Sequence, residues 1–258
     1  MAYAPVNGTQ MYYEEYGNGP STIVFAHGAG GNHLSWWQQI PFFSKKYQCI
    51  TFSHRRFHFS LDIPNGPGVA AHVEDLTALL DYLKIKKTAL VAQSMGGRTC
   101  FGFLLAHPER VSALVMADTV AGIPSSQITQ LREKLAKERD KKGIPQLSYS
   151  ATFGQRDPTK WFLYEEIRGL NQGFGRAEVA ATSPPPPPDL DLSKIKVPVL
   201  FLFGSEDVLI APETGRLAHS LIPGSRYVEI PGAGHSTYFE KPDEFNYQVA
   251  SFLKEQKI

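Results

Sequence analysis

Short apolar runs alternate with amphipathic segments along most of the chain. Six runs have the length and composition of buried strands, and they cover residues 21–27, 47–53, 88–93, 111–118, 197–204 and 225–232. Between these runs, apolar residues recur at helical spacing in Val69–Leu83, Met95–His107 and Glu240–Leu253. Alternation of strand and helix predicts an α/β fold, with a mostly parallel central sheet and helices on both of its faces.

The N-terminal segment has a different pattern. Two β-like stretches flank Asn7-Gly8 and end near Tyr16. Asn-Gly is the preferred pair for a two-residue hairpin turn, so the segment predicts a β-hairpin. Asn7-Gly8-Thr9 also matches a glycosylation acceptor, but we expect no signal peptide, so the hairpin turn is the preferred interpretation.

Residues 122–193 interrupt the alternation. They contain a charged amphipathic helical pattern at 125–143, a second at 158–170, and a proline-rich stretch at 183–194 that predicts a stiff, extended spacer. We therefore expect a core formed by residues 1–121 and 194–258, with a helical cap at 122–193 inserted before the penultimate strand. A surface insertion without further function is the alternative.

The composition narrows the class of protein. The 258 residues are 42% hydrophobic and 20% charged, and the formal net charge is +1. These values are typical of a globular protein and give no reason to expect a nucleic acid or a membrane as partner. Cys49 and Cys100 do not form a disulfide framework and are interpreted as buried thiols. We expect a soluble, cytoplasmic protein with a small-molecule substrate, and both a monomer and a homodimer remain open.

A serine lies where the third of these runs meets the next helical pattern. In Ala92-Gln93-Ser94-Met95-Gly96 the small neighbours allow a sharp strand-to-helix turn that displays the serine side chain. The helix that follows directs its free N–H groups and positive dipole end toward the same point. The segment resembles the nucleophile elbow of the α/β-hydrolase superfamily, G-x-S-x-G, with alanine in place of the first glycine.

A serine nucleophile needs a base, and the base needs a carboxylate that holds its tautomer. Asp207 follows the apolar run 197–204, and His235 follows the next run, so both are expected at the same sheet edge as Ser94. These segments resemble the acid and histidine segments of the superfamily. Asp118, after the run 111–118, is the rival acid, and Asp207 is preferred.

The stretch Phe25–Trp37 is rich in glycine. It lacks the Gly-Lys-Ser/Thr ending and the G-x-G-x-x-G spacing of nucleotide-binding loops. It resembles the superfamily's His-Gly oxyanion loop. That resemblance implies that the backbone N–H groups of Ala29 and Met95 stabilise the oxyanion.

Residues 53–60 depart from the superfamily pattern D-x-R-G-x-G-x-S. They read Ser-His-Arg-Arg-Phe-His-Phe-Ser, so two glycines are lost and basic side chains gather at the expected active-site edge. We hypothesise that this loop favours substrates with a carboxylate, while a solvated basic loop is the alternative. His54 and His58 alone do not indicate a metal site, because a third ligand is missing.

The substrate contacts can be narrowed only to a few side chains. We predict contacts from Trp36, Arg56, Phe57 and Trp161, and the wider set of pocket candidates also includes Trp37, Phe162 and Tyr164.

The resemblance implies a serine hydrolase of the esterase, enol-lactonase and carbon–carbon bond hydrolase group. We predict hydrolysis of a small, largely apolar carboxylic ester or lactone through an acyl-enzyme, without a cofactor or a metal. Cleavage of a carbon–carbon bond in a vinylogous diketone is the enzymatic alternative. A ligand-binding receptor with negligible turnover is the alternative from another class, and a structural protein is the least favoured.

Overall fold

The computed structural model describes residues 2–184 and 188–258, and over these residues the strands form one eight-stranded sheet in the order β1-β2-β4-β3-β5-β6-β7-β8. The strands are β1 (Ala2–Val6), β2 (Thr9–Tyr16), β3 (Thr22–Ala26), β4 (Gln48–Phe52), β5 (Thr88–Gln93), β6 (Val111–Ala117), β7 (Val199–Gly204) and β8 (Arg226–Ile230). The strands from β3 to β8 pair in parallel, and β1 and β2 add an antiparallel hairpin at one edge. The predicted α/β fold is confirmed.

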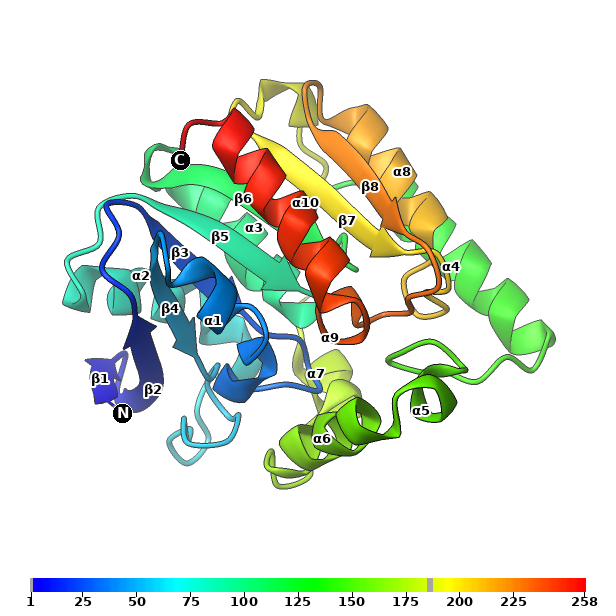
Figure 1. Ribbon diagram of the computed structural model, residues 1–258, viewed down its shortest axis with the longest axis horizontal. Coiled ribbons are helices and arrows are strands. Elements are labelled where there is room, and N and C mark those ends of the chain that lie inside the picture. The colour runs from blue at the N-terminus through cyan, green and yellow to red at the C-terminus, as the bar shows by residue number, and fades with distance from the viewer. Residues whose placement is uncertain (1, 185–187) are drawn as a thin grey trace.

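Helices cover both faces of the sheet (Figure 1). They are α1 (Ile40–Phe43), α2 (His72–Tyr82), α3 (Met95–Ala106), α8 (Pro212–Leu221), α9 (Thr237–Glu240) and α10 (Pro242–Glu255). One core cluster joins α2, α3 and α8 to strand residues such as Leu90, and the other joins α1 and α10 to strand residues such as Val91. Neighbouring strand residues point to opposite faces, so these continuous apolar runs are buried on both sides.

The segment between β6 and β7 is helical. It contains α4 (Ser126–Lys141), α5 (Phe153–Arg156), α6 (Pro158–Gly169) and α7 (Arg176–Thr182). Its two longest helices match the predicted helical patterns. The predicted proline-rich spacer at 183–194 lies partly outside the described residues, and Leu192–Lys194 forms a 3-10 turn.

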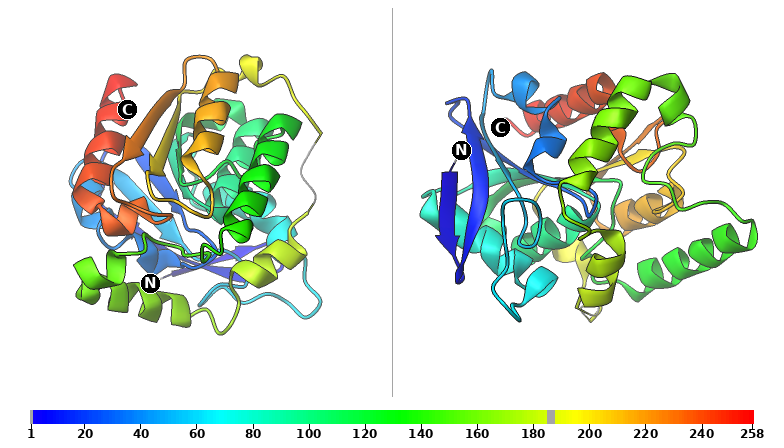
Figure 2. Two further views of the ribbon diagram at one scale, coloured as in Figure 1. Left: turned by 90° about the vertical axis from the view of Figure 1, so that its right-hand side faces the viewer. Right: turned by 90° about the horizontal axis from the view of Figure 1, so that it is seen from below.

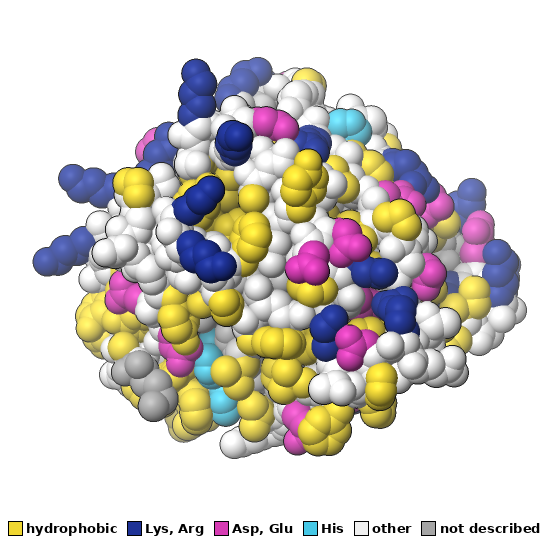
Figure 3. Space-filling model, in the orientation of Figure 1, with side chains coloured by type: hydrophobic (Ala, Val, Ile, Leu, Met, Phe, Trp, Pro, Cys, Tyr) yellow, Lys and Arg dark blue, Asp and Glu magenta, His cyan; other side chains and the backbone are white. Residues whose placement is uncertain are grey.

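The inserted helices lie beside the edge of the sheet where the parallel strands end (Figures 1 and 2). Helices α5, α6 and α7 lie below this edge in Figure 1, and α4 packs beside α8. Charged side chains of both signs are interspersed over the right-hand side of the molecule, and apolar side chains are more frequent over its lower part (Figure 3). We refer to the inserted residues 122–193 as the cap segment.

Among the described residues, no helix combines the length and the apolar character needed to cross a membrane.

Candidate active site

Ser94 lies at a sharp turn between β5 and α3. Its backbone angles, φ 49° and ψ −114°, fall outside the common regions for a residue with a side chain. The turn is held by the Ser94 N–H, which donates to the Ala117 carbonyl, and by the Thr119 hydroxyl, which donates to the Ser94 carbonyl at 2.8 Å. A Cβ on Gly96 would lie 2.3 Å from the Ala26 carbonyl oxygen, so this close approach requires glycine. The predicted nucleophile elbow has the expected geometry.

Three predicted residues from distant parts of the chain meet at this turn. The Ser94 hydroxyl lies 2.8 Å from His235 Nε2, and His235 Nδ1 lies 2.8 Å from Asp207 Oδ2. The other Asp207 oxygen accepts the N–H groups of Leu209 and Ile210 at 2.8 and 2.9 Å. This arrangement has the connectivity of a nucleophile, a base and an orienting acid.

The environment of His235 sets its basicity. Burial by itself lowers the pKa of the imidazole, but the carboxylates of Asp207 and Asp118 raise it by more, and Arg176 opposes them. The net result is a pKa above the ordinary histidine value. A base of this kind accepts a proton from a serine hydroxyl more readily than an ordinary imidazole does.

The rival acid Asp118 is also near the site, but it does not contact the imidazole nitrogen that Asp207 binds. Its carboxylate oxygens accept the Gly204 N–H at 3.0 Å, the Thr237 N–H at 3.0 Å and the Thr237 hydroxyl at 2.7 Å. The geometry therefore favours Asp207 as the orienting acid.

The glycine-rich loop after β3 faces the same point. His27 Nδ1 lies 2.8 Å from the Gly28 carbonyl, and the Gly31 N–H donates to that carbonyl as well. Because the peptide bond is planar and trans, fixing this carbonyl directs the Ala29 N–H the opposite way. Within residues 2–184 and 188–258, neither Ala29 N–H nor Met95 N–H donates to another group of the protein. Both are free to bind an oxyanion.

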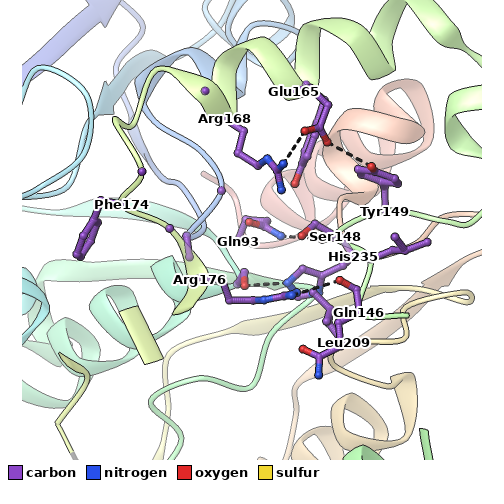
Figure 4. A pocket seen from close by; sticks show the side chains of 18 residues that line it. Gln93, Gln146, Ser148, Tyr149, Glu165, Arg168, Phe174, Arg176, Leu209 and His235 are labelled. Atoms are coloured by element: carbon purple, nitrogen blue, oxygen red, sulfur yellow. Dashed lines mark hydrogen bonds and ion pairs between the residues drawn. The ribbon is translucent and has the colours of Figure 1, made fainter. Parts of the chain in front are cut away.

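A cavity of about 410 Å³ opens at the Ser94 side chain, and the cap segment supplies much of its wall (Figure 4). The part of the wall outside the cap consists of Ala29 and Gly30 of the glycine-rich loop, Gln93 and Ser94 of the elbow, Leu209 and His235. The cap residues of the wall are Gln146, Leu147, Ser148, Tyr149, Tyr164, Glu165, Arg168, Gly169, Gly173, Phe174, Gly175 and Arg176. The cap is attached beside His235, since the Ser236 hydroxyl donates to the Ser148 carbonyl at 2.7 Å. A small organic substrate fits a cavity of this size.

Two arginines face this cavity from the cap (Figure 4). Arg168 forms a 2.8 Å ion pair with Glu165. Arg176 donates a 3.3 Å hydrogen bond to the Gln146 carbonyl, and among the described residues it has no carboxylate within ion-pair distance. The cavity wall therefore carries a cationic side chain that is not neutralised by the protein.

The four predicted substrate contacts, Trp36, Arg56, Phe57 and Trp161, lie outside the wall of this cavity. Trp36 is completely buried in the core cluster that contains α1 and α10. Phe57 is also completely buried and packs against His27 and Phe174. Trp161 packs near Gly154, and its indole N–H donates to the Tyr149 hydroxyl. None of these side chains forms part of the cavity wall, whereas Tyr164 of the wider aromatic set does.

The basic loop at 53–60 is also turned away from the cavity. Arg55 is buried and paired with Asp75 at 2.7 Å and Asp62 at 2.8 Å. His54 is buried against Thr99. The charge of Arg55 is therefore neutralised within the fold, and of the basic side chains in this loop only Arg56 and His58 are left for the predicted contact with a substrate carboxylate.

The two remaining side chains of the loop also lie outside the cavity. His58 stacks on His33, and Arg56 lies over the Phe174 ring at 4.5 Å, beside a separate depression.

Gln93, Arg168 and Arg176 line the cavity but were not among the predicted site residues. Gln93 lies within the elbow and immediately precedes the serine, so its position in the sequence already indicated that it lies close to the site. No such signal marks Arg168 or Arg176, because they are two of several basic residues on amphipathic cap helices. Their position depends on how the cap folds back over the sheet.

Comparison with known proteins gives consistent matches. A family model described as alpha/beta hydrolase fold matches residues 21–141, and a second, described as TAP-like protein, matches residues 176–258. The 3-oxoadipate enol-lactonase 2 of Acinetobacter baylyi is 28% identical over 90% of this chain and 88% of its own.

Solved structures agree with these matches. The enol-lactonase of Burkholderia xenovorans is 27% identical with a TM-score of 0.79, over 98% of this chain and 99% of its own. An esterase of Thermogutta terrifontis has the same fold, with a TM-score of 0.79, 24% identity and coverage of 99% and 98%.

Proposed function

The chain belongs to the α/β-hydrolase superfamily, and we propose that it is a hydrolase of ester bonds that cleaves a small ester or lactone through an acyl-enzyme formed on Ser94. The observation that carries this proposal is the hydrogen-bonded series from Ser94 Oγ through His235 to Asp207, at 2.8 Å in each step, on the wall of a substrate-sized cavity.

The chemistry follows from this geometry. Ser94 Oγ attacks the carbonyl carbon while its proton passes to His235 Nε2, and Asp207 stabilises the resulting imidazolium. The negative charge on the carbonyl oxygen is bound by the N–H groups of Ala29 and Met95. Collapse of this intermediate breaks the bond to the alkoxide, which takes the proton from His235. A water molecule then attacks the acyl-enzyme with His235 as base, which releases the acid and regenerates Ser94.

A carboxylate on the substrate is favoured by Arg176. This side chain lies on the cavity wall beside His235 and lacks a carboxylate partner among the described residues (Figure 4). Arginine binds carboxylates through paired N–H donors, and a charged hydrogen bond of this kind contributes about 1.5–3 kcal/mol. The similarity to an enzyme named 3-oxoadipate enol-lactonase supports the same substrate class.

Labelling with a fluorophosphonate probe tests the nucleophile. We expect one label per chain on the peptide that contains Ser94 and none on Ser94→Ala, together with turnover of short esters or lactones by the wild type. Absence of label on folded protein would contradict the proposal and favour a ligand-binding receptor. Label combined with turnover of a dienoate diketone, but of no ester or lactone, would instead indicate a carbon–carbon bond hydrolase.

Paired substrates test the preference for a carboxylate. We expect Arg176→Gln to lower kcat/KM for a half-ester of a dicarboxylic acid by about 10-fold, and to leave the matched neutral ester within about 2-fold. Lys137→Gln removes the same charge from the exposed surface of α4 and serves as control. Equal losses on both esters would show that Arg176 does not select for charge.

A further inference from the structure

Asp118 is a completely buried carboxylate at the end of β6, and the function proposed above does not use it. Its backbone adopts a left-handed conformation with φ 51°. A residue with a side chain is held there only when the surroundings compensate for the strain, which costs about 1–3 kcal/mol. A buried charge in a strained position requires specific partners.

The partners of Asp118 come from the two segments that carry the acid and the base. One carboxylate oxygen accepts the N–H of Gly204, which ends β7 three residues before Asp207. The other accepts the N–H and the hydroxyl of Thr237, two residues after His235. Asp118 therefore links the acid segment and the histidine segment through a single side chain.

Its chain neighbours extend this link to the serine. The Ala117 carbonyl accepts the Ser94 N–H at 3.2 Å, and the Thr119 hydroxyl donates to the Ser94 carbonyl at 2.8 Å. Residues 117–119 thus contact the segments of all three residues of the proposed triad. This is a consequence of sheet order, because β6 lies between β5, which precedes Ser94, and β7, which precedes Asp207.

We propose that Asp118 is a positioning residue for the triad, which holds His235 in place through Thr237 and stabilises its protonated form through the Asp118 charge. This inference rests on the proposed function, since it assumes that His235 acts as the base. Asp118 does not contact the His235 nitrogen that receives the Ser94 proton. Asp207 remains the residue that orients the imidazole.

The electrostatics are consistent with this assignment. Burial and the charge of Asp207 raise the pKa of Asp118, while His235 and the hydrogen bonds from Thr237 lower it, and the net result is a pKa of about 7. In the other direction, the charges that act on His235 are those of Asp207, Asp118 and Arg176. Protonation of His235 during the reaction therefore favours the ionised form of Asp118, and ionised Asp118 favours the imidazolium.

The test is the pH dependence of fluorophosphonate labelling and of short-ester hydrolysis. We expect Asp118→Asn to lower kcat by about 10-fold with little change in KM, and to move the acidic limb of both profiles to lower pH by about half a unit or more. The limb moves down because removing a negative charge lowers the pKa of His235. A purely structural contribution would reduce the rate without moving the limb.

Thr237 provides a matched pair of variants in case Asp118→Asn does not fold. Thr237→Val removes one hydrogen bond that lowers the pKa of Asp118, so Asp118 is less ionised and the limb moves in the same direction by a smaller amount. Thr237→Ser retains the hydroxyl and should leave the limb in place. An unchanged limb in both Asp118→Asn and Thr237→Val would overturn the proposal.

Labelling separates this inference from the proposed function. Reaction of Ser94 with a fluorophosphonate requires the activated serine and not a particular substrate. A wild type that is labelled but hydrolyses no ester or lactone would refute the proposed reaction, and the labelling profiles would still test Asp118.

Discussion

The side-chain amide of Gln93 donates a 2.7 Å hydrogen bond to the backbone carbonyl of His235. The residue before the proposed nucleophile is thereby joined to the backbone of the proposed base, across 142 positions of the chain. Gln93 is buried, and its side-chain oxygen lies so close to Gly28 that a Cβ there would be only 2.0 Å away. The amide therefore fills the space between the glycine-rich loop and the histidine segment.

We predict that Gln93→Leu lowers kcat by about 10-fold or more. The buried His235 carbonyl loses its donor, which costs about 1–3 kcal/mol, and the histidine is held less firmly relative to Ser94. Steady-state kinetics on a short ester measure the effect. A fall in thermal stability with unchanged kcat at a temperature where the variant is folded would contradict this prediction.

Gly96 is predicted to be intolerant of a side chain. A Cβ at this position would lie 2.3 Å from the Ala26 carbonyl oxygen, which belongs to the backbone of β3 and cannot move without disturbing the sheet. We expect Gly96→Ala to reduce the free energy of unfolding by about 1–3 kcal/mol and to displace the elbow. Denaturant unfolding measures the loss. Gly169→Ala is the matched control, because a Cβ there meets nothing within 4 Å.

The pH profile of the wild-type enzyme reports on His235. The base must be neutral to accept the Ser94 proton, and its pKa is raised by Asp207 and Asp118 against the effect of burial. Activity should therefore fall as the pH drops through a value above about 6.5, the ordinary pKa of histidine. The acidic limb of kcat/KM measures this value. A limb centred below pH 6 would contradict the assignment.

Buried histidines make the fold sensitive to acid. Burial lowers the pKa of His27 to about 3 and that of His72 to about 4. The unfolded chain therefore binds more protons than the folded chain between about pH 6.5 and 4, so stability is complete above this window and decreases as the pH falls through it. We expect His72→Gln to reduce this slope. Unfolding free energies at pH 8, 6 and 5 measure it, and the value at pH 8 isolates the effect on packing.

Arg55 should contribute strongly to stability although it does not reach the cavity. Its guanidinium makes two 2.7 Å hydrogen bonds to Asp75, and both side chains are completely buried. Arg55→Met leaves a buried carboxylate without its partner, which costs about 3–5 kcal/mol. Lys194→Ala removes an exposed pair with Asp191 and is the control, for which we expect no measurable change in stability because solvent screens this pair. Equal effects in denaturant unfolding would refute the distinction.

The sequence by itself determined the α/β architecture and the arrangement of the proposed triad. Apolar runs of strand length alternate with helical periodicity, and parallel strands present their carboxyl ends at one edge. Ser94, Asp207 and His235 each follow such a run, so their convergence required no knowledge of packing. Asp118 follows a run as well, and the preference for Asp207 came from the resemblance of its segment to the acid segment of the superfamily. The small residues around Ser94 were also sufficient to predict the sharp turn, because its strain is local.

Tertiary structure alone decided which other side chains line the site. Arg55 and Arg56 are adjacent and basic, yet one is buried against Asp75 and the other lies over Phe174. Arg168 and Arg176 are ordinary basic residues of cap helices until the chain folds back over the sheet edge. The environment of a side chain depends on partners that are distant in sequence, and the periodicity of a single segment carries no information about those partners.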